Sequence, residues 1–278
     1  VGAVVMMGIG CSAPPAPVAP SSDLGTDLGV LIAAAVGDGS VVRGAALAVE
    51  SPKLGISWSG AAGLADPEGG AAMTAATPVR LASNTKTYVA AAVLRLVEDR
   101  RLALDQPVGE LLPAEATALL EGDGYDLQAM RLRHLLTHTS GLFDHTSSPR
   151  YEEAILADPQ HRWTPLEQVA RAVEWGDPHG APGEIYTYCD TGYVLLGLIL
   201  ERATGQGIAG AVRELVGFER LGLAATWWET LEPAPEGAPG RAHQFLGERD
   251  TFGFDPSLDL YGGGGLAAPV NDLARFTR

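Results

Sequence analysis

Lysine is scarce in this sequence of 278 residues, which contains two lysines and seventeen arginines. Positive charge is scarce as a whole, because 19 Lys and Arg residues stand against 34 Asp and Glu residues, for a formal net charge of −15. So acidic a chain is a poor partner for nucleic acid or for an anionic membrane surface. We therefore expect a small-molecule or peptide substrate and no nucleic-acid partner, and the sequence leaves the oligomeric state open.

Cysteine is almost absent as well, since Cys11 and Cys189 are the only two, and we therefore expect no disulfide framework. The first ten residues are apolar and uncharged, a run too short for an ordinary membrane-spanning helix. Cys11 and a stretch rich in Pro, Ala and Ser follow, in a pattern that resembles a bacterial lipoprotein signal and tether. We expect Cys11 to carry lipid and to anchor an extracytoplasmic protein to a bacterial membrane; the alternative is a merely hydrophobic tail.

One of the two lysines lies three residues after a serine, in Ser83-Asn84-Thr85-Lys86. With twelve serines and two lysines in the chain, this spacing is expected by chance only about 0.09 times. Arginine stays charged, so a chain that needs a neutral amine as a base must use lysine. The motif thus predicts a nucleophile and its base. The alternative is a serine that caps a helix, followed by a solvated lysine.

Helical periodicity supports the first of these interpretations. Between residues 84 and 99 the apolar residues recur at the spacing of an amphipathic helix. Lys86 falls on the apolar face, so we expect its amine to point toward the core and burial to lower its pKa. Residues three apart on a helix are neighbours, which brings the Ser83 hydroxyl within reach of Lys86. The free backbone N–H of Ser83 at the helix start supplies half of an oxyanion hole.

The remaining patterns suggest a mixed architecture. Residues 23–36 are predicted to form a helix, residues 44–50 and 55–60 a β-hairpin, and residues 102–207 a series of helices. We accordingly divide the chain into a signal-like segment and tether (1–22), the first part of an α/β subdomain with the nucleophile helix (23–101), and a helical subdomain (102–278).

Four motifs in order carry a family resemblance. They are Ser83-Asn84-Thr85-Lys86, the segment from Arg133 to Leu142 with its His-Thr-Ser-Gly-Leu end, Tyr188-Cys189-Asp190 within residues 182–193, and the glycine run Gly262–Gly265. From Asp23 onward the chain resembles the penicillin-recognising serine hydrolases. The likeness is to the branch that holds class C β-lactamases, D-Ala-D-Ala carboxypeptidases, D-aminopeptidases and family VIII esterases.

The resemblance implies roles for named residues. Ser83 is the acylated nucleophile, Lys86 its basic partner and Tyr188 a second base or proton relay, while Asp190 and Gly264 bind substrate. No cofactor and no metal is implied. The implied fold is α+β, with an antiparallel sheet that is flanked by helices, built from both chain ends and packed against an all-α domain.

The implied activity is hydrolysis of a peptide, ester or β-lactam carbonyl through an acyl-enzyme on Ser83. The first alternative is a penicillin-binding or sensor module that is acylated and turns over poorly. The second is a structural surface protein with a decayed site. Rapid acylation by a β-lactam without turnover would indicate the first, and failure of Ser83 to react with a fluorophosphonate would indicate the second.

Two departures from the family pattern bear on the chemistry. Asp190 occupies the place of the family's asparagine, and an ionised carboxylate only accepts hydrogen bonds. It would also keep Lys86 charged, unless Asp190 is protonated or turned away. The family's third motif, Lys-Thr-Gly or His-x-Gly, has no match, so we expect a chain truncated at both ends, with the C-terminal strands missing after Arg278.

Other motifs indicate structure rather than chemistry. His134 and His138 have the spacing of a helical zinc pair but lack the glutamate that should lie between them. The glycine run from Gly262 completes no phosphate-binding motif, so we expect a tight turn near the active-site helix. The residues expected to serve packing are Trp227 and Trp228, with lining of a substrate cleft as the alternative, and Cys189, which we expect to face away from the cleft.

Overall fold

The computed structural model describes residues 24–37 and 40–278. The predicted signal-like segment and Cys11 lie outside the described residues. Within the described residues, no helix combines the length and the apolar character needed to cross a membrane.

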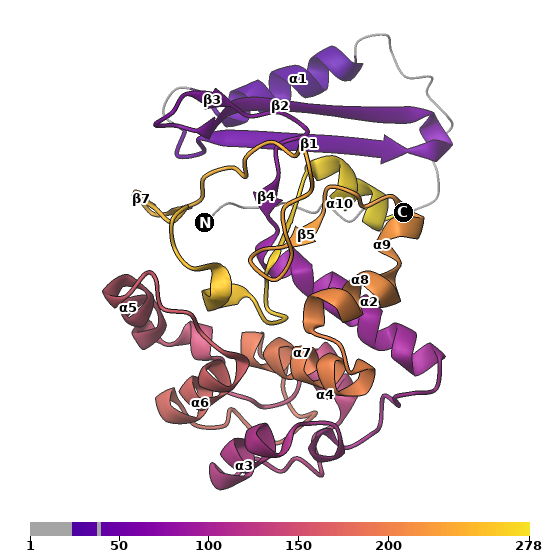
Figure 1. Cartoon of the computed structure of the whole chain (residues 1–278), viewed down its shortest axis with the longest axis vertical. Helices are drawn as coiled ribbons and strands as arrows, with labels where there is room; N and C mark the ends of the chain where they lie inside the picture. The colour runs from indigo at the N-terminus through magenta and orange to yellow at the C-terminus, as the bar shows by residue number, and fades with distance from the viewer. Residues whose placement is uncertain (1–23, 38–39) are drawn as a thin grey trace.

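The N-terminal part forms a small layered unit, at the top of Figure 1. Strands β1 (Gly44–Ser51) and β2 (Ile56–Asp66) pair antiparallel, from Gly44 opposite Gly63 to Ser51 opposite Ile56, and the short β3 (Ala71–Ala72) continues the sheet beyond β2. Helix α1 (Leu24–Ala35) packs on the hairpin, and the C-terminal helix α10 (Val270–Phe276) packs against β1. The predicted helix and hairpin are therefore present, and both chain ends contribute to this layer.

A second, smaller sheet leads into the nucleophile helix. Strand β4 (Val79–Arg80) pairs with β8 (Leu266–Ala268), which pairs in turn with β5 (Trp227–Trp228). Strands β5 and β8 fall within residues 102–278, which the sequence analysis assigned to a helical subdomain without predicting either strand. Both are too short to give a strand pattern of their own, and they exist through their pairing with each other and the pairing of β8 with β4. A separate two-stranded sheet joins β6 (Phe245–Leu246) and β7 (Arg249–Asp250).

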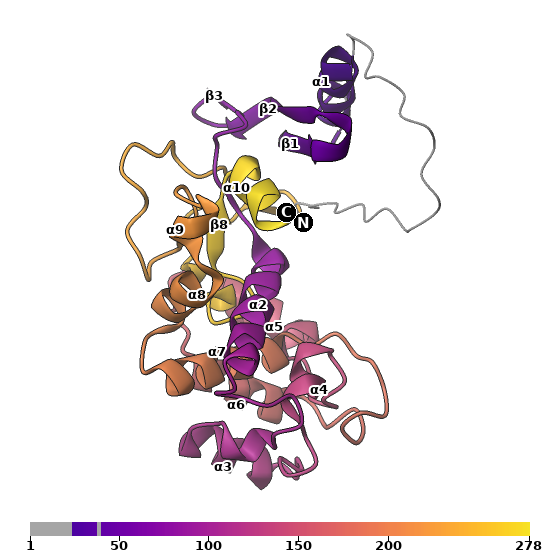
Figure 2. The ribbon, with the colours of Figure 1, turned by 90° about the vertical axis from the view of Figure 1, so that its right-hand side faces the viewer.

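Helix α2 (Thr85–Glu98) runs from the second sheet into the helical part of the molecule, as Figure 2 shows. The predicted apolar face of this helix is buried, with Val89, Val93 and Leu96 fully inaccessible. It packs against α7 (Asp190–Thr204) and α8 (Ile208–Val216) in one continuous core. The other helices of this part are α3 (Ala114–Gly122), α4 (Leu132–Leu136), α5 (Pro149–Ala157), α6 (Pro165–Trp175) and α9 (Phe218–Leu221).

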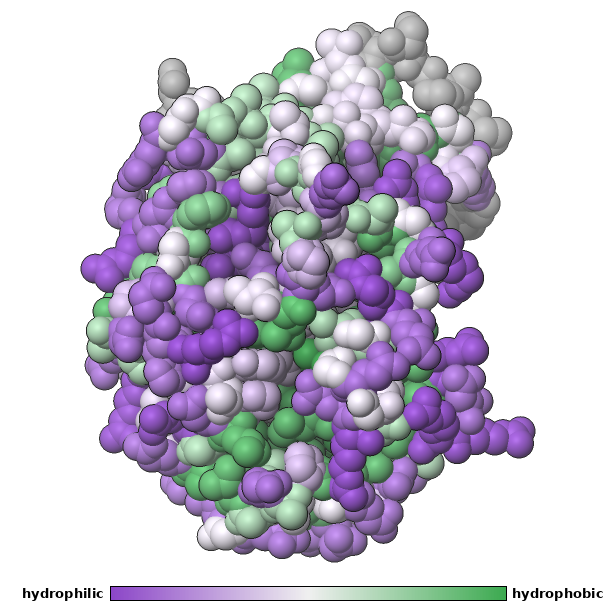
Figure 3. Space-filling model, in the orientation of Figure 1, coloured by the Kyte–Doolittle hydropathy of each residue, from purple (hydrophilic) through white to green (hydrophobic). Residues whose placement is uncertain are grey.

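Hydrophilic and apolar side chains are distributed unevenly over the surface. Figure 3 shows hydrophilic side chains over most of the visible face, with apolar side chains gathered mainly toward the helical end. Both tryptophans of β5 are buried, Trp227 to 7% and Trp228 to 1% exposure, and the Trp228 indole N–H donates to the Leu260 carbonyl at 2.7 Å. This burial confirms that the two tryptophans serve packing.

Candidate active site

Ser83 is presented by a strained turn between strand and helix. Strand β4 ends at Arg80, and Ala82 then adopts φ +44, a left-handed conformation that costs a non-glycine residue about 1–2 kcal/mol. Ser83 follows in a short 3₁₀ turn, Ala82–Asn84, which leads directly into α2. The turn is fixed from the other side by β8, because the Leu81 N–H donates to the Leu266 carbonyl at 2.8 Å. The serine hydroxyl is therefore held at the helix start, as the motif predicted.

The Ser83 hydroxyl receives two hydrogen bonds from residues that the sequence singled out. Lys86 Nζ donates to Ser83 Oγ at 3.1 Å, and the Tyr188 hydroxyl donates to the same oxygen at 2.8 Å. Lys86 Nζ lies 5.2 Å from the centre of the Tyr188 ring. Tyr188 is 41% exposed whereas Lys86 is 5% exposed, so the tyrosine lies on the solvent side of Ser83 and the lysine on the core side. A nucleophile thus contacts both a basic side chain and a phenol.

Lys86 is held in its charged form. Its Nζ donates to Ser83 Oγ, to the Gly263 carbonyl at 2.7 Å and to Asp190 Oδ1 in an ion pair. Burial lowers the pKa of Lys86, as we predicted, but the negative charges of Asp190 and Asp259 oppose it and bring the pKa above its ordinary value of 10.5. The expectation of a net lowered pKa is therefore wrong. The physical reason is that Asp190 faces the ammonium instead of turning away.

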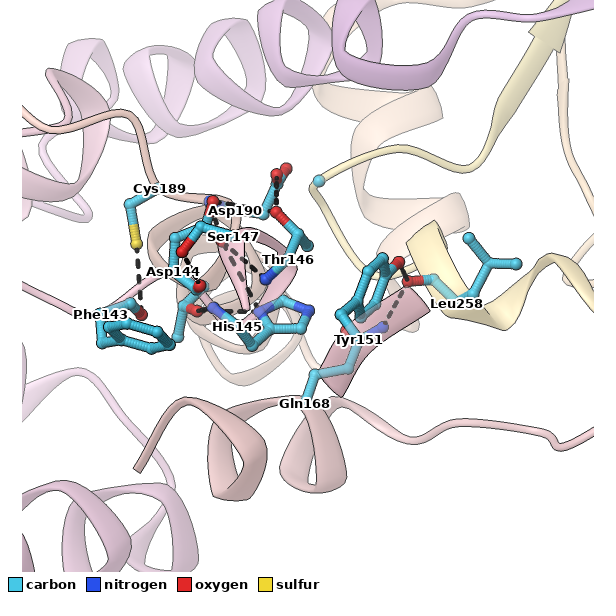
Figure 4. A network of polar contacts seen from close by, with 12 residues as sticks. Phe143, Asp144, His145, Thr146, Ser147, Tyr151, Gln168, Cys189, Asp190 and Leu258 are labelled. Atoms are coloured by element: carbon cyan, nitrogen blue, oxygen red, sulfur yellow. Dashed lines mark hydrogen bonds and ion pairs between the residues drawn. The ribbon is translucent and has the colours of Figure 1, made fainter. Parts of the chain in front are cut away.

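Asp190 links Lys86 to a buried polar network, drawn in Figure 4. It is the first residue of α7, and its Oδ2 accepts from the Thr146 hydroxyl at 2.9 Å. The same hydroxyl lies 2.9 Å from Asp144 Oδ2. Beside them, the buried His145 has its Nδ1 2.9 Å from Thr191 Oγ1. Burial lowers the pKa of His145 to about 4, so its ring is neutral at neutral pH.

The glycine run forms the predicted tight turn beside the active-site helix. The Gly263 carbonyl accepts from Lys86, and a side chain at this position would meet the Asp190 and Asp259 carboxylates at 3.0 Å. Gly264 is buried against Asp259, where an added Cβ would lie 2.1 Å from Oδ2. Glycine is required here because the backbone approaches the carboxylates so closely. Contact between Gly264 and substrate stays a prediction.

Two neighbours of Tyr188 support the loop that carries it. His138 stacks on the Tyr188 ring with a centroid distance of 4.4 Å, and its Nδ1 accepts the Cys189 N–H at 3.1 Å. The Cys189 thiol is buried in the core, with its Sγ 3.7 Å from the Phe143 carbonyl, and burial raises its pKa to about 12. Cys189 is therefore a packing residue, as predicted, and not a nucleophile.

Among the described residues, no three His, Cys, Asp or Glu side chains are grouped so that they could hold a metal ion.

Sequence reasoning did not identify Asp144, Thr146 and Asp259 as parts of this site. Asp144 follows the His-Thr-Ser-Gly-Leu segment by two residues, and Asp259 precedes the glycine run by three. Their closeness to two quoted motifs was the available signal. The sequence could not show that these motifs meet behind Lys86.

Comparison with known proteins places this geometry in a family. The family model described as Beta-lactamase matches residues 25–278. Esterase EstB of Burkholderia gladioli is 34% identical over 243 residues, which cover 77% of this chain and 60% of the esterase. The chain thus spans less than two thirds of that relative's length.

Two similar solved structures are a D-stereospecific amidohydrolase from Streptomyces sp. and the D-amino acid amidase of Ochrobactrum anthropi SV3 complexed with L-phenylalanine amide. The first has 28% sequence identity and a TM-score of 0.74, and the match covers 91% of this chain and 72% of the amidohydrolase. The second has 27% sequence identity and a TM-score of 0.74, and the match covers 92% of this chain and 69% of the amidase. The resemblance drawn from the motifs and the mixed helix and sheet fold are both confirmed. The chain belongs to the beta-lactamase family, within the superfamily of penicillin-recognising serine hydrolases.

Proposed function

We propose that the protein is a serine hydrolase that forms an acyl-enzyme through Ser83 on a peptide, ester or β-lactam carbonyl. The observation that carries the proposal is the pair of hydrogen bonds from Lys86 and Tyr188 to the Ser83 oxygen. The named relatives, an esterase and two amidohydrolases, support carbonyl hydrolysis as the reaction class. Tyr188 is 41% exposed and is therefore accessible to a substrate that approaches Ser83.

The reaction begins with attack of Ser83 Oγ on the substrate carbonyl carbon. The Ser83 proton passes to Lys86 in its neutral form, and the oxyanion that develops is met by the Ser83 backbone N–H. Tyr188 then gives its proton to the leaving group as the carbonyl–leaving group bond breaks, and Lys86 returns a proton to Tyr188. Water next attacks the carbonyl carbon of the acyl-Ser83 ester. Lys86 and Tyr188 now take the proton from the water and return one to Ser83 Oγ, which releases the acid and frees Ser83.

The ion pair between Lys86 and Asp190 sets the pH dependence of the acylation step. Since the pKa of Lys86 lies above 10.5, the neutral amine is a minor form at neutral pH. Its fraction grows about tenfold with each pH unit below that pKa. Acylation is therefore expected to accelerate as the pH rises through the neutral range.

Covalent labelling tests the nucleophile. The purified protein is treated with an activated aryl ester, a fluorophosphonate or a β-lactam, and the adduct is located by peptide mass spectrometry. We expect it on the Ser83 peptide, absent in Ser83→Ala and retained in the matched variant Ser40→Ala, which alters an exposed serine. An adduct on another residue would refute the assignment. Acylation by a β-lactam without release would indicate the penicillin-binding or sensor module, and no adduct with any reagent a structural role.

We further propose that the protein is extracytoplasmic and is anchored through lipid on Cys11. The support is the apolar run, the cysteine and the Pro/Ala/Ser stretch that follows it. Growth of expressing cells with labelled palmitate should label the protein, and Cys11→Ser should abolish the label. Cys189→Ser is the matched control, because that thiol is buried. Equal labelling of the wild type and Cys11→Ser would contradict the proposal.

A further inference from the structure

Three carboxyl groups gather behind Lys86. Asp144 precedes the 3₁₀ turn His145–Ser147, Asp190 begins α7, and Asp259 ends the 3₁₀ turn Pro256–Asp259. In the described part of the chain, Lys86 is the one cation hydrogen-bonded to any of them. If all three were ionised, one ammonium would face three negative charges in the protein interior.

Neither solvent nor a neighbouring side chain balances this excess of negative charge. The space between Thr146, Asp190 and Asp259 leaves no room for a water-sized sphere, and the side chains of Asp144 and Asp190 are only 7% and 14% exposed. His145 is neutral, and Arg80, whose charge acts on Asp259, is itself engaged by Glu229 at 2.5 Å. An unpaired buried carboxylate takes up a proton rather than remain charged.

The hydrogen bonds of Thr146 indicate where one proton resides. Its hydroxyl oxygen lies 2.9 Å from Asp144 Oδ2 and 2.9 Å from Asp190 Oδ2. A threonine hydroxyl has a single proton, so it can donate to one of these oxygens at full strength. The other contact is a hydrogen bond only if a carboxyl group donates to the threonine oxygen.

The remaining contacts distinguish the two carboxyl groups. Asp190 Oδ1 accepts from the Lys86 ammonium, which stabilises Asp190 as the anion. Asp144 has no such cation, and its Oδ1 accepts the backbone N–H groups of Thr146 and Asp190, both at 3.1 Å. Oδ2 of Asp144 is thus the oxygen that is left to bear a proton.

We propose that Asp144 keeps a proton in the resting protein and acts as a positioning residue for Asp190. Asp144 Oδ2–H donates to Thr146 Oγ1, the Thr146 hydroxyl donates to Asp190 Oδ2, and Asp190 Oδ1 accepts from Lys86. This chain turns Asp190 toward the lysine and limits the negative charge beside it. Its catalytic consequence rests on the proposed function, whereas the presence of the proton does not.

The titratable groups around Asp144 agree with this assignment. Burial raises the pKa of Asp144, and the charge of Asp190 raises it further, while the Thr146 and backbone hydrogen bonds oppose them. From the neighbouring elements, His145 is neutral, the buried thiol of Cys189 holds its proton, and Tyr151 has its pKa raised by burial. Lys86 is the cation on the far side of Asp190.

Infrared spectroscopy tests the proton directly. At about pH 6, below the pKa of about 7 to which burial raises Asp259, the wild type should show C=O stretching bands of two protonated buried carboxyl groups. Asp144→Asn should remove one band and Asp259→Asn the other. A spectrum without a band that depends on Asp144 would overturn the proposal, whatever the enzymatic activity.

Kinetics test the positioning role. The Asp144→Asn amide can donate to Thr146 and accept the two backbone N–H groups, so kcat/KM should fall less in this variant than in Thr146→Val. Thr146→Val keeps the shape but breaks the chain, and we expect at least about a tenfold loss of kcat/KM, whereas Thr146→Ser should restore it. The alkaline part of the pH profile should shift in Thr146→Val and not in Thr146→Ser.

Two results would refute the positioning role: a loss of 100-fold or more in folded Asp144→Asn, or equal activity and pH profiles in Thr146→Val and Thr146→Ser. Ser83 labelling in the same variants separates this failure from failure of the proposed function. If Ser83 never reacts, the proposed function fails, and the infrared bands still decide whether Asp144 holds the proton.

Discussion

Replacing Asp190 by asparagine tests how the charge on Lys86 is controlled. The side chains of Lys86 and Asp190 are 6% and 14% exposed, so their ion pair is largely shielded from water. The amide retains the shape of the carboxylate, keeps an oxygen for Lys86 and adds an N–H that can donate to Thr146. The substitution therefore removes one negative charge and little else.

The balance of effects on the pKa of Lys86 gives the direction. Burial, the largest effect, lowers this pKa, and Asp190 is the first of the groups that raise it, ahead of Asp259. Without Asp190 the pKa should fall by at least about one unit, which increases the neutral amine about tenfold at neutral pH. The folded state should lose stability, by an amount between the ~1 kcal/mol of an exposed pair and the ~3–5 kcal/mol of breaking a fully buried one.

The assay compares kcat/KM for an aryl ester and for an amide from about pH 6 to pH 9. We expect Asp190→Asn to retain or improve turnover, most clearly for the amide, with the pH profile shifted toward lower pH. A loss of 100-fold or more on every substrate would refute the reasoning and show that the carboxylate itself is required.

Three further changes probe the same site. Lys86→Arg should be nearly as damaging to acylation as Lys86→Ala, because arginine keeps the charge but cannot act as a neutral base, and wild-type rates in Lys86→Arg would count against a basic role. Gly264→Ala should lower the melting temperature and slow acylation by about tenfold or more, since its Cβ would lie 2.1 Å from Asp259 Oδ2, while Gly240→Ala, with open space around it, should change neither. Asp259 has its pKa raised from 3.8 to about 7, so its bound proton stabilises the fold at low pH and this contribution fades as the pH rises across that interval. Relative to Asp259→Asn, the wild type should lose up to about 1.4 kcal/mol of unfolding free energy per pH unit there, and parallel denaturation curves would contradict this.

The sequence allowed the local features of the site to be predicted. The period of apolar residues placed Lys86 on the buried face of α2, and the structure leaves it 5% exposed. The scarcity of lysine drew attention to Ser83, and the loop with Tyr188 and Asp190 lies against both residues. Such features follow from spacing along one element or from a motif.

Features that depend on contacts between distant segments could not be predicted. Strand β8 consists of Leu266-Ala267-Ala268, and alanine favours strands weakly, so its conformation comes from pairing with β4 and β5. Thr146 and Asp190 are 44 residues apart in the chain, yet share a hydrogen bond. The charge of Lys86 depends on such contacts, and for this reason its pKa was predicted in the wrong direction.

The outer edge of β1 is a place where the sheet can be extended. Among residues 24–37 and 40–278, only β2 pairs with this strand, so eight residues present a free row of backbone groups to any other extended chain. Proteins commonly protect such an edge with lysine or proline, and β1 contains neither. Its one charged residue, Glu50, is neutralised by an ion pair with Arg278. An extended segment of the same protein or of a second molecule that pairs with this edge would therefore lengthen the sheet by one strand.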